Sequence, residues 1–411
     1  MKRIILLLQL VIVTTILALS AGCSNAPAQR NQTWSSTDPF APPLPGTHEL
    51  AKPRHIALLL PLSGPYGAYA TALKNGFFTA YYDQKNRTGY SPNISVIDTQ
   101  GKDIQTVVQT AIAQGADFIV GPLDKANVAT LAASNQTHVP ILALNTTPSN
   151  ERINNSALYE FGLSPTAEAA QAAQKAWQDR RHNVIILAPN NVLGQRVANA
   201  FSTRWKTLGG TVVAQQFYGN MASLSKNLRT VLQIDSADQN AHELKAMFHE
   251  DVRSIPQRRQ DFDSIFLVAT PDMGRQIQPL LRFYFAGNIP IYTTSQIYTG
   301  TLNADADHDL DGMIFCDMPW ILAPNQMPSD NLRALQQHIQ MLWPDTATRY
   351  AKFYAMGVDA FNLTSQLNKM QSAPQLGIAA ATGTLYLTPQ HTIDRQLLWA
   401  QFKNGAPQLV R

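Results

Sequence analysis

Short, continuous apolar segments alternate with longer segments of helical periodicity over most of this 411-residue chain. The first apolar run, 56–60, is followed by apolar side chains from Tyr66 to Tyr81 at spacings of three and four residues. A strand that is apolar at every position is buried on both faces, which is typical of parallel sheets with helices on both sides. The alternation therefore predicts an α/β fold.

This alternation occurs twice along the chain. The apolar runs are 56–60, 94–97, 118–120 and 141–144 in the first series, and 184–187, 265–268 and 291–293 in the second. A helix introduced by Ser164 and Pro165 separates the two series. We predict two Rossmann-like lobes with parallel sheets. Their expected bounds are about 54–163 and 318–370 for the first lobe, and about 164–317 and 371–411 for the second.

The last part of the chain is expected to complete both lobes. Helical periodicity predicts helices near 332–342 and 354–367. The segments 384–387 and 397–402 are predicted to pair with each other as a closing hairpin.

Two lobes of this kind bring the carboxyl ends of their strands to a shared crevice, where α/β proteins usually bind ligands. The loops expected there contain hydroxyl, amide and glycine residues. The candidate residues of this interlobe cleft are Ser63, Gly64, Tyr66, Gly121, Asn145, Asn190, Thr270, Ser295 and Tyr298.

The N-terminus has the pattern of a secretory signal peptide. Lys2 and Arg3 precede an apolar run, 4–18, and small residues follow up to Cys23. The sequence Leu-Ser-Ala-Gly-Cys resembles a bacterial lipobox, so we expect removal of residues 1–22 and lipidation of Cys23. A fifteen-residue run is short for the alternative, an uncleaved membrane anchor. Ser24 follows the lipid site, which in lipoprotein sorting implies the outer membrane, with the protein facing the periplasm.

Residues 23–53 are predicted to form a lipidated, proline-rich tether before a body that spans 54–411. Six prolines lie among Ser, Thr, Asn and Gln, without apolar periodicity. Fully extended, about thirty residues would reach roughly 100 Å.

Composition and motifs argue against several classes of function. Charged residues make up 15% of the chain, against about 25% in typical soluble domains, so no nucleic-acid partner is expected. No G-x-S-x-G, G-x-G-x-x-G or P-loop motif occurs, and His242-Glu243 lacks the second histidine of a zinc protease. Ser223 to Lys226 matches S-x-x-K without its companion motifs. We therefore predict no enzyme and no cofactor.

Three further groups are interpreted as structural. The aspartates of 307–312 resemble the start of a calcium loop, but the twelfth position is Met318, so a polar turn is expected and no metal. Cys316 lies in an apolar stretch and is expected to be a small buried side chain, since Cys23 would carry lipid. Arg258 and Arg259 are predicted to be solvated or to form ion pairs between the lobes.

Nine segments carry a family resemblance. They are RRQDFD (258–263), IFLVA (265–269), FYFAG (283–287), LLLPLSG (58–64), DFIVGPL (117–123), FGLSP (161–165), FCDMPW (315–320), AMGVDA (355–360) and WAQFKNG (399–405). Together they resemble the penicillin-binding protein activator lipoproteins, the LpoA (LppC) family, over about residues 54–411.

The resemblance implies a type I periplasmic-binding-protein fold and an outer-membrane lipoprotein of peptidoglycan biosynthesis and cell shape. It also implies that the protein binds and activates a class A bifunctional penicillin-binding protein without performing chemistry. Longer family members carry a helical-repeat domain before this one, and here a 30-residue tether precedes His55. We expect the activating contact to lie in the body.

The fold alone leaves a second function open. A periplasmic receptor for an amino acid or a cell-wall fragment would hold its ligand at Ser63, Asn145 and Ser295. Receptors that bind amino acids generally offer a carboxylate to the ammonium group, and Asp272 is the candidate in the expected crevice loops.

Overall fold

The computed structural model describes residues 51–410, apart from 135–136, 148–152, 220, 235–246 and 248–257. These residues belong to one compact unit. The signal peptide, Cys23, most of the tether and His242-Glu243 lie outside them, so the expectations for those segments stay predictions.

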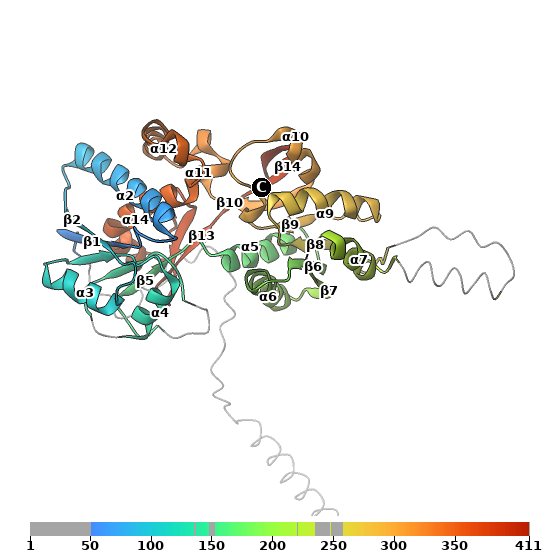
Figure 1. Ribbon diagram of the computed structural model, residues 1–411, viewed down its shortest axis with the longest axis horizontal. Helices are drawn as coiled ribbons and strands as arrows, with labels where there is room; N and C mark the ends of the chain where they lie inside the picture. Colours follow the sequence, from blue (N-terminus) through green and yellow to red (C-terminus); the bar gives the residue numbers. More distant parts are fainter. Residues whose placement is uncertain are drawn as a thin grey trace, which may run out of the picture. The chain divides into compact units, whose positions relative to one another are not determined.

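Eight strands form the first sheet, in the order β11-β12-β13-β5-β4-β3-β1-β2 (Figure 1). Their bounds are β1 (His55–Leu60), β2 (Asn93–Asp98), β3 (Phe118–Val120), β4 (Ile141–Ala143), β5 (Leu158–Phe161), β11 (Ile378–Ala379), β12 (Thr384–Leu387) and β13 (Thr392–Gln396). β1 pairs in parallel with both β2 and β3, and β3, β4 and β5 continue in parallel. The sheet is therefore doubly wound, with its switch point between β1 and β3.

Helices cover both faces of this sheet, and together they form the first lobe. The helices are α2 (Gly67–Thr88), α3 (Ile104–Ala113), α4 (Lys125–Ala133), α12 (Asp330–Leu342) and α14 (Ala351–Ser372). Leu58 packs in the core with Phe77 of α2 and Phe361 of α14, whereas Leu59 packs with Val107 and Leu131 of α3 and α4. Burial on both faces explains why β1 is apolar at consecutive positions.

The second lobe repeats this plan with seven strands, in the order β15-β14-β10-β9-β8-β6-β7. Its elements are α5 (Pro165–Gln178), β6 (Asn183–Pro189), α6 (Val192–Thr207), β7 (Thr211–Tyr218), α7 (Met221–Val231), β8 (Ser264–Leu267), α9 (Pro271–Phe283), β9 (Ile291–Thr293), β10 (Met313–Asp317), β14 (Leu398–Lys403) and β15 (Ala406–Val410). β6 lies between β7 and β8 in parallel, just as β1 lies between β2 and β3. Two lobes with the same strand order confirm the predicted fold class.

Short helices complete the described chain. They are η1 (Ser295–Ile297), α10 (Ala304–Asp307), η2 (His308–Leu310), α11 (Pro319–Leu322), η3 (Pro324–Gln326) and α13 (Pro344–Ala347). Within the described ranges, no helix combines the length and the apolar character needed to cross a bilayer.

The predicted closing hairpin is wrong. β12 pairs with β13 in the first sheet, whereas β14 pairs with β10 and β15 in the second, so the chain changes sheet at Leu397. β13 is recruited to the first sheet by parallel pairing with β5, at Thr392 with Glu160 and Ile393 with Phe161. As a result 378–396, expected in the second lobe, extends the first sheet, and 398–410 alone extends the second.

Two glycines allow the closest helix contact in the first lobe. A Cβ atom on Gly357 of α14 would overlap the carbonyl oxygen of Leu73 in α2, and one on Gly76 of α2 would overlap that of Tyr354. The backbones of α2 and α14 therefore touch directly where the helices cross, which only glycine permits.

Replacing Gly357 with alanine should lower the free energy of unfolding by about 3 kcal/mol, because the added methyl group forces two packed helices apart. Gly101→Ala is the matched control. Gly101 has a φ of +69°, and no described atom lies within 4 Å of the place that a Cβ atom would take, so its loss should be about 1 kcal/mol. Denaturant unfolding measures both, and equal losses would contradict the close contact.

Candidate functional site

The predicted cleft residues of the first lobe follow the carboxyl ends of β1, β3 and β4. Ser63 donates a hydrogen bond to Asp98 Oδ2 at 2.6 Å, and the Leu62 N–H donates to Asp98 Oδ1 at 2.9 Å. The Ser63 bond is the largest of several that lower the pKa of Asp98. Gly64 follows with a φ of +76°, and Tyr66 is half exposed just before α2. The Ser63 hydroxyl therefore has a structural partner, the carboxylate of Asp98.

Gly121 and Asn145 also have local structural roles. A Cβ atom on Gly121 would overlap the carbonyl oxygen of Leu59, so glycine is required by the close approach of β3 to β1. The Asn145 side chain donates to the carbonyl of Leu123 at 3.0 Å and accepts from the N–H of Thr146 at 2.9 Å. This amide therefore joins the loop after β4 to the loop after β3.

The second lobe places its predicted residues at the equivalent strand ends. Asn190 accepts a hydrogen bond from Gln195 at 3.3 Å, and the exposed Thr270 immediately precedes α9. The Tyr298 ring packs against Phe315 and Phe402, and burial raises its pKa. Tyr298 is therefore mainly a core side chain.

Asp272, the residue considered for an ammonium ligand, has an 85% exposed side chain and forms an ion pair with Arg275 at 3.0 Å. Arg275 also pairs with the buried Asp307 at 2.7 Å. Both carboxylates therefore form ion pairs with Arg275 inside the second lobe.

Ser295 is the one predicted cleft residue with a hydrogen bond to the other lobe within the described residues. It is buried, and its hydroxyl accepts from Lys352 Nζ of α14 at 2.7 Å. Its N–H donates to Glu168 Oε2 of α5 at 3.1 Å. Sequence reasoning placed Ser295 in the crevice but did not find these partners.

Four charged side chains form the centre of the lobe junction, which we call the junction network: Glu168, Asp317, Lys352 and Arg395. Lys352 Nζ lies 3.1 Å from Asp317 Oδ2, and an Arg395 terminal nitrogen lies 3.5 Å from Glu168 Oε1. The two cations come from the first lobe and the two carboxylates from the second. The network is therefore neutral, and both ion pairs join one lobe to the other.

The junction network lies beside all three places where the chain passes between the lobes. Arg395 donates to the carbonyl of Gly162, directly after β5, at 3.1 Å. Asp317 ends β10, and Arg395 itself lies just before the change of sheet at Leu397. The two ion pairs therefore lie at the hinge between the lobes.

Burial dominates the electrostatics of the junction. It raises the pKa of Asp317 to about 6, opposed by the ammonium of Lys352 and reinforced by Glu168. Cys316 is free and fully buried beside Asp317, and burial raises the pKa of its thiol. The prediction that Cys316 is a small buried side chain is confirmed.

The arginine pair at 258–259 does not link the lobes in the described structure. Arg259 forms two hydrogen bonds of 2.7 Å with Asp261, and Arg258 donates to the carbonyl of Phe285 at 2.8 Å. Asp263 accepts from the N–H of His182 at 2.8 Å. The motif 258–263 therefore holds the entry to β8 against neighbouring segments of the second lobe.

The aspartates of 307–312 are also used inside the fold. Asp307 pairs with Arg275, and Asp311 accepts from the N–H groups of Asn404 and Gly405 at 3.1 and 2.9 Å. No group of three or more acidic, histidine or cysteine side chains suited to a metal occurs among the described residues.

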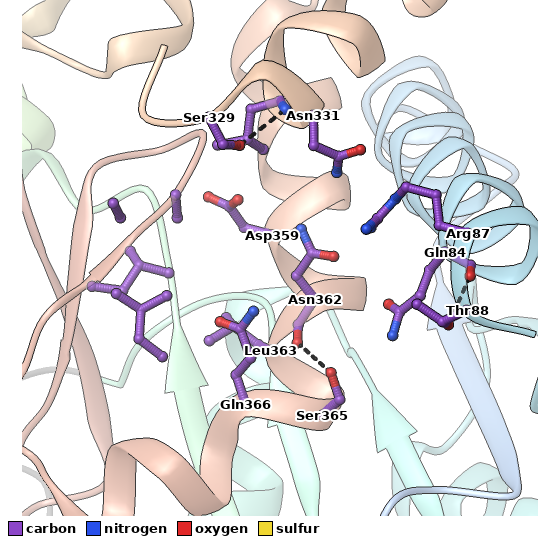
Figure 2. Close-up of a pocket in the computed structure, with 15 residues that line it drawn as sticks. Gln84, Arg87, Thr88, Ser329, Asn331, Asp359, Asn362, Leu363, Ser365 and Gln366 are labelled. Carbon is purple, nitrogen blue, oxygen red and sulfur yellow. Dashed lines mark hydrogen bonds between the residues drawn. The ribbon is translucent and has the colours of Figure 1, made fainter. Parts of the chain in front are cut away.

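A separate cavity of about 280 Å³ lies in the first lobe (Figure 2). We call it the polar groove. Its lining residues are Gln84, Arg87, Thr88, Ser329, Asn331, Leu332, Asp359, Asn362, Leu363, Ser365, Gln366, Ile378, Ala379, Ala380 and Leu385. The sequence offered no signal for it, because polar side chains spaced along helices resemble an ordinary solvated face.

The fold and the junction define the class of this protein as periplasmic-binding-protein-like, with two doubly wound lobes joined by three crossings. A putative branched-chain amino acid ABC transporter from Chromobacterium violaceum is similar, with a TM-score of 0.61 and 25% identity, over 85% of this chain and 99% of that one.

The chain belongs to the LppC putative lipoprotein family, whose model matches residues 46–405. It is 28% identical over 387 residues to the penicillin-binding protein activator LpoA of Vibrio antiquarius. The aligned region covers 90% of this chain and 62% of that protein. It is also similar to the LpoA (YraM) C-domain from Haemophilus influenzae, described as a regulator of PBP1A. That similarity has 28% identity and a TM-score of 0.66, over 87% of this chain and all of the other. The family resemblance is confirmed.

Replacing Lys352 with methionine should lower the free energy of unfolding by about 3 kcal/mol at pH 7.5, because Asp317 loses its cation while still buried. The loss should shrink at pH 5.0. The pKa of Asp317 is about 6 in the folded protein, above its ordinary value, so ionisation of this carboxyl lowers the stability as the pH rises toward 6. Loss of the Lys352 ammonium raises this pKa further, so the variant loses additional stability above pH 6. At pH 5.0 the carboxyl is mostly protonated in both proteins, and the difference between them is small. Denaturant unfolding at both pH values measures the difference.

Lys369→Met is the control for this prediction, because it removes the same charge from the same helix. Lys369 is exposed and has no ion pair within the described part of the chain. Its replacement should have a small effect at either pH. A loss from Lys352→Met that does not depend on pH would contradict the assigned role of Asp317.

Proposed function

We propose that this protein binds and activates a class A bifunctional penicillin-binding protein, and that it does so without catalysing a reaction. The observation that carries the proposal is the match to the whole LpoA C-domain from Haemophilus influenzae, described as a regulator of PBP1A. The chain spans 62% of the length of its Vibrio antiquarius relative, and the matched part is the two-lobed body.

The mechanism we propose is a shift between conformations of the synthase. An activator can favour the active state only by as much as its affinity for that state exceeds its affinity for the other. In this proposal the two interlobe ion pairs of the junction network hold both lobes in one arrangement. A rigid surface of this kind loses little conformational entropy on binding, which leaves more of the contact energy for discrimination.

We also propose that lipid on Cys23 anchors the protein in the inner leaflet of the outer membrane, facing the periplasm. The family is one of putative lipoproteins, and Cys23 follows the signal-peptide pattern. The tether would let the body approach a synthase that is anchored in the opposite membrane.

The solute receptor is the second candidate, and the likeness to a putative amino acid transporter structure favours it. Two contacts weigh against an amino acid at the junction. The Ser295 hydroxyl is bonded to Lys352, and Asp272 pairs with Arg275. A ligand at a hundredfold its dissociation constant adds about 2.7 kcal/mol of stability, so a thermal-shift panel of amino acids, sugars and wall fragments separates the two functions.

Residues 24–411, without the lipid, should accelerate glycan polymerisation or peptide cross-linking by the purified class A synthase of the same organism, in a dose-dependent way. The effect should saturate, because it depends on a defined complex. Turnover of lipid-linked substrate and analysis of cross-linked products measure it.

This assay has two controls. The same body unfolded by heat should not stimulate the class A synthase, and the folded body should not stimulate a class B synthase. Binding without any change in rate would contradict activation. Absence of both binding and stimulation would contradict the proposed partner.

Cys23→Ala should abolish incorporation of labelled palmitate and move the protein from the outer-membrane fraction to the soluble periplasm, because the thiol is the proposed attachment point. Cys316→Ala is the matched control and should retain the label, since Cys316 is fully buried. Labelled protein in the Cys23 variant would contradict the anchor.

A further inference from the structure

The polar groove runs along α14 and is bordered by four other elements. Figure 2 shows the end of α2 on one side, the start of α12 above, and Asn362 and Gln366 projecting from α14 between them. Ile378 and Ala379 of β11 and Leu385 of β12 also line the groove. All of these elements belong to the first lobe, so the groove is distinct from the interlobe crevice.

Four primary amides of the groove have no hydrogen bond from their side chains to any described residue. They are Gln84, Asn331, Asn362 and Gln366. All four are half-buried, not extended into solvent. Each amide carries two donors and an acceptor. A groove with several half-buried and unpaired amides is suited to a ligand that itself alternates donors and acceptors.

Arg87 adds one positive charge to this set. Its Nε donates to Asp83 Oδ2 at 2.8 Å, and the end of its side chain, which is 52% exposed, points toward Asn362 (Figure 2). The buried carboxylate in the groove, Asp359, is already bonded by the N–H groups of Ala381 and Thr382 at 2.9 and 2.7 Å. The charge available to a ligand is therefore that of a guanidinium, which binds carboxylates through paired nitrogens.

The far side of the groove is the edge of the first sheet. β11 is the last strand, and in the described structure Ile378 and Ala379 pair with β12 alone. Ile378 and Leu385 lie directly opposite each other on these strands and both line the groove, so the sheet contributes an apolar face to it. Among the described residues that line the groove none is aromatic, so it lacks the stacking surface that would favour a sugar ring.

We propose that the polar groove binds a short extended peptide with a free terminal carboxylate. The peptide backbone pairs with the four amides, an apolar part of the peptide contacts Ile378 and Leu385, and the carboxylate is held by Arg87. The small volume of the cavity, about 280 Å³, limits the bound segment to a few residues. This inference goes beyond the proposed function and does not depend on contact with a synthase.

The test uses the full chain and three kinds of ligand. Two are libraries of N-acetylated tripeptides, one with free carboxyl termini and one with amidated termini. The third is the sugar tri-N-acetylglucosamine. NMR shifts of the amide side chains of Asn and Gln report binding, even when it is weak. We expect the free-carboxylate library to bind at least about tenfold more tightly than the amidated one, because a charged hydrogen bond is lost. Binding of the sugar in preference to both libraries, or no binding at all, would overturn the proposal.

Arg87→Gln should weaken binding of the free-carboxylate library about tenfold and leave the amidated library unchanged. Asn362→Leu should weaken both libraries, because it removes an amide that pairs with the peptide backbone. Arg196→Gln, at an exposed position of α6 in the second lobe, is the control and should change neither. Melting temperatures establish that all three variants are folded. Equal effects of Arg87→Gln on the two libraries would refute the placement of the carboxylate.

Discussion

Two ion pairs at the lobe junction constrain the arrangement of the whole body. Lys352 and Arg395 from the first lobe meet Asp317 and Glu168 from the second, next to all three crossings of the chain. Each charge has lost most of its water, and its partner belongs to the other lobe. Separation of the lobes at this junction would leave buried charges unpaired, which costs several kcal/mol. The two lobes are therefore coupled more strongly than their covalent connections alone require.

Such a junction is better understood as a source of specificity than of stability. A buried ion pair often contributes less to folding than an apolar pair of the same size, because desolvation offsets the attraction. What it provides is a defined geometry, since charges in the interior tolerate few alternative arrangements. A transport receptor must open and close around its ligand, whereas an activator gains from holding one surface in place. The contact of Lys352 with Ser295 fits the second requirement.

The sequence was most informative where a single strand or helix determines its own pattern. The run 56–60 predicted a buried parallel strand because burial on both faces makes every position apolar. The sequence was uninformative where two distant segments meet. Nothing near Arg395 indicates that its partner is Glu168, and β12 and β14 have similar patterns although they join different sheets. Which sheet a late strand joins depends on which sheet edge is still unpaired when the rest of the chain has folded. Local periodicity cannot predict this, because it describes only the strand itself.

The segments that carry the family resemblance illustrate the same distinction between fold and function. Arg259 and Asp261 of the 258–263 motif bond to each other, and Asp359 of the 355–360 motif holds the turn at Ala381 and Thr382. Burial raises the pKa of Asp359 to about 6, which indicates a carboxylate committed to the interior. These residues explain why the resemblance predicted the fold well. Recognition of a ligand or partner has to involve exposed or half-buried groups that the fold leaves available, and the amides of the polar groove are of that kind.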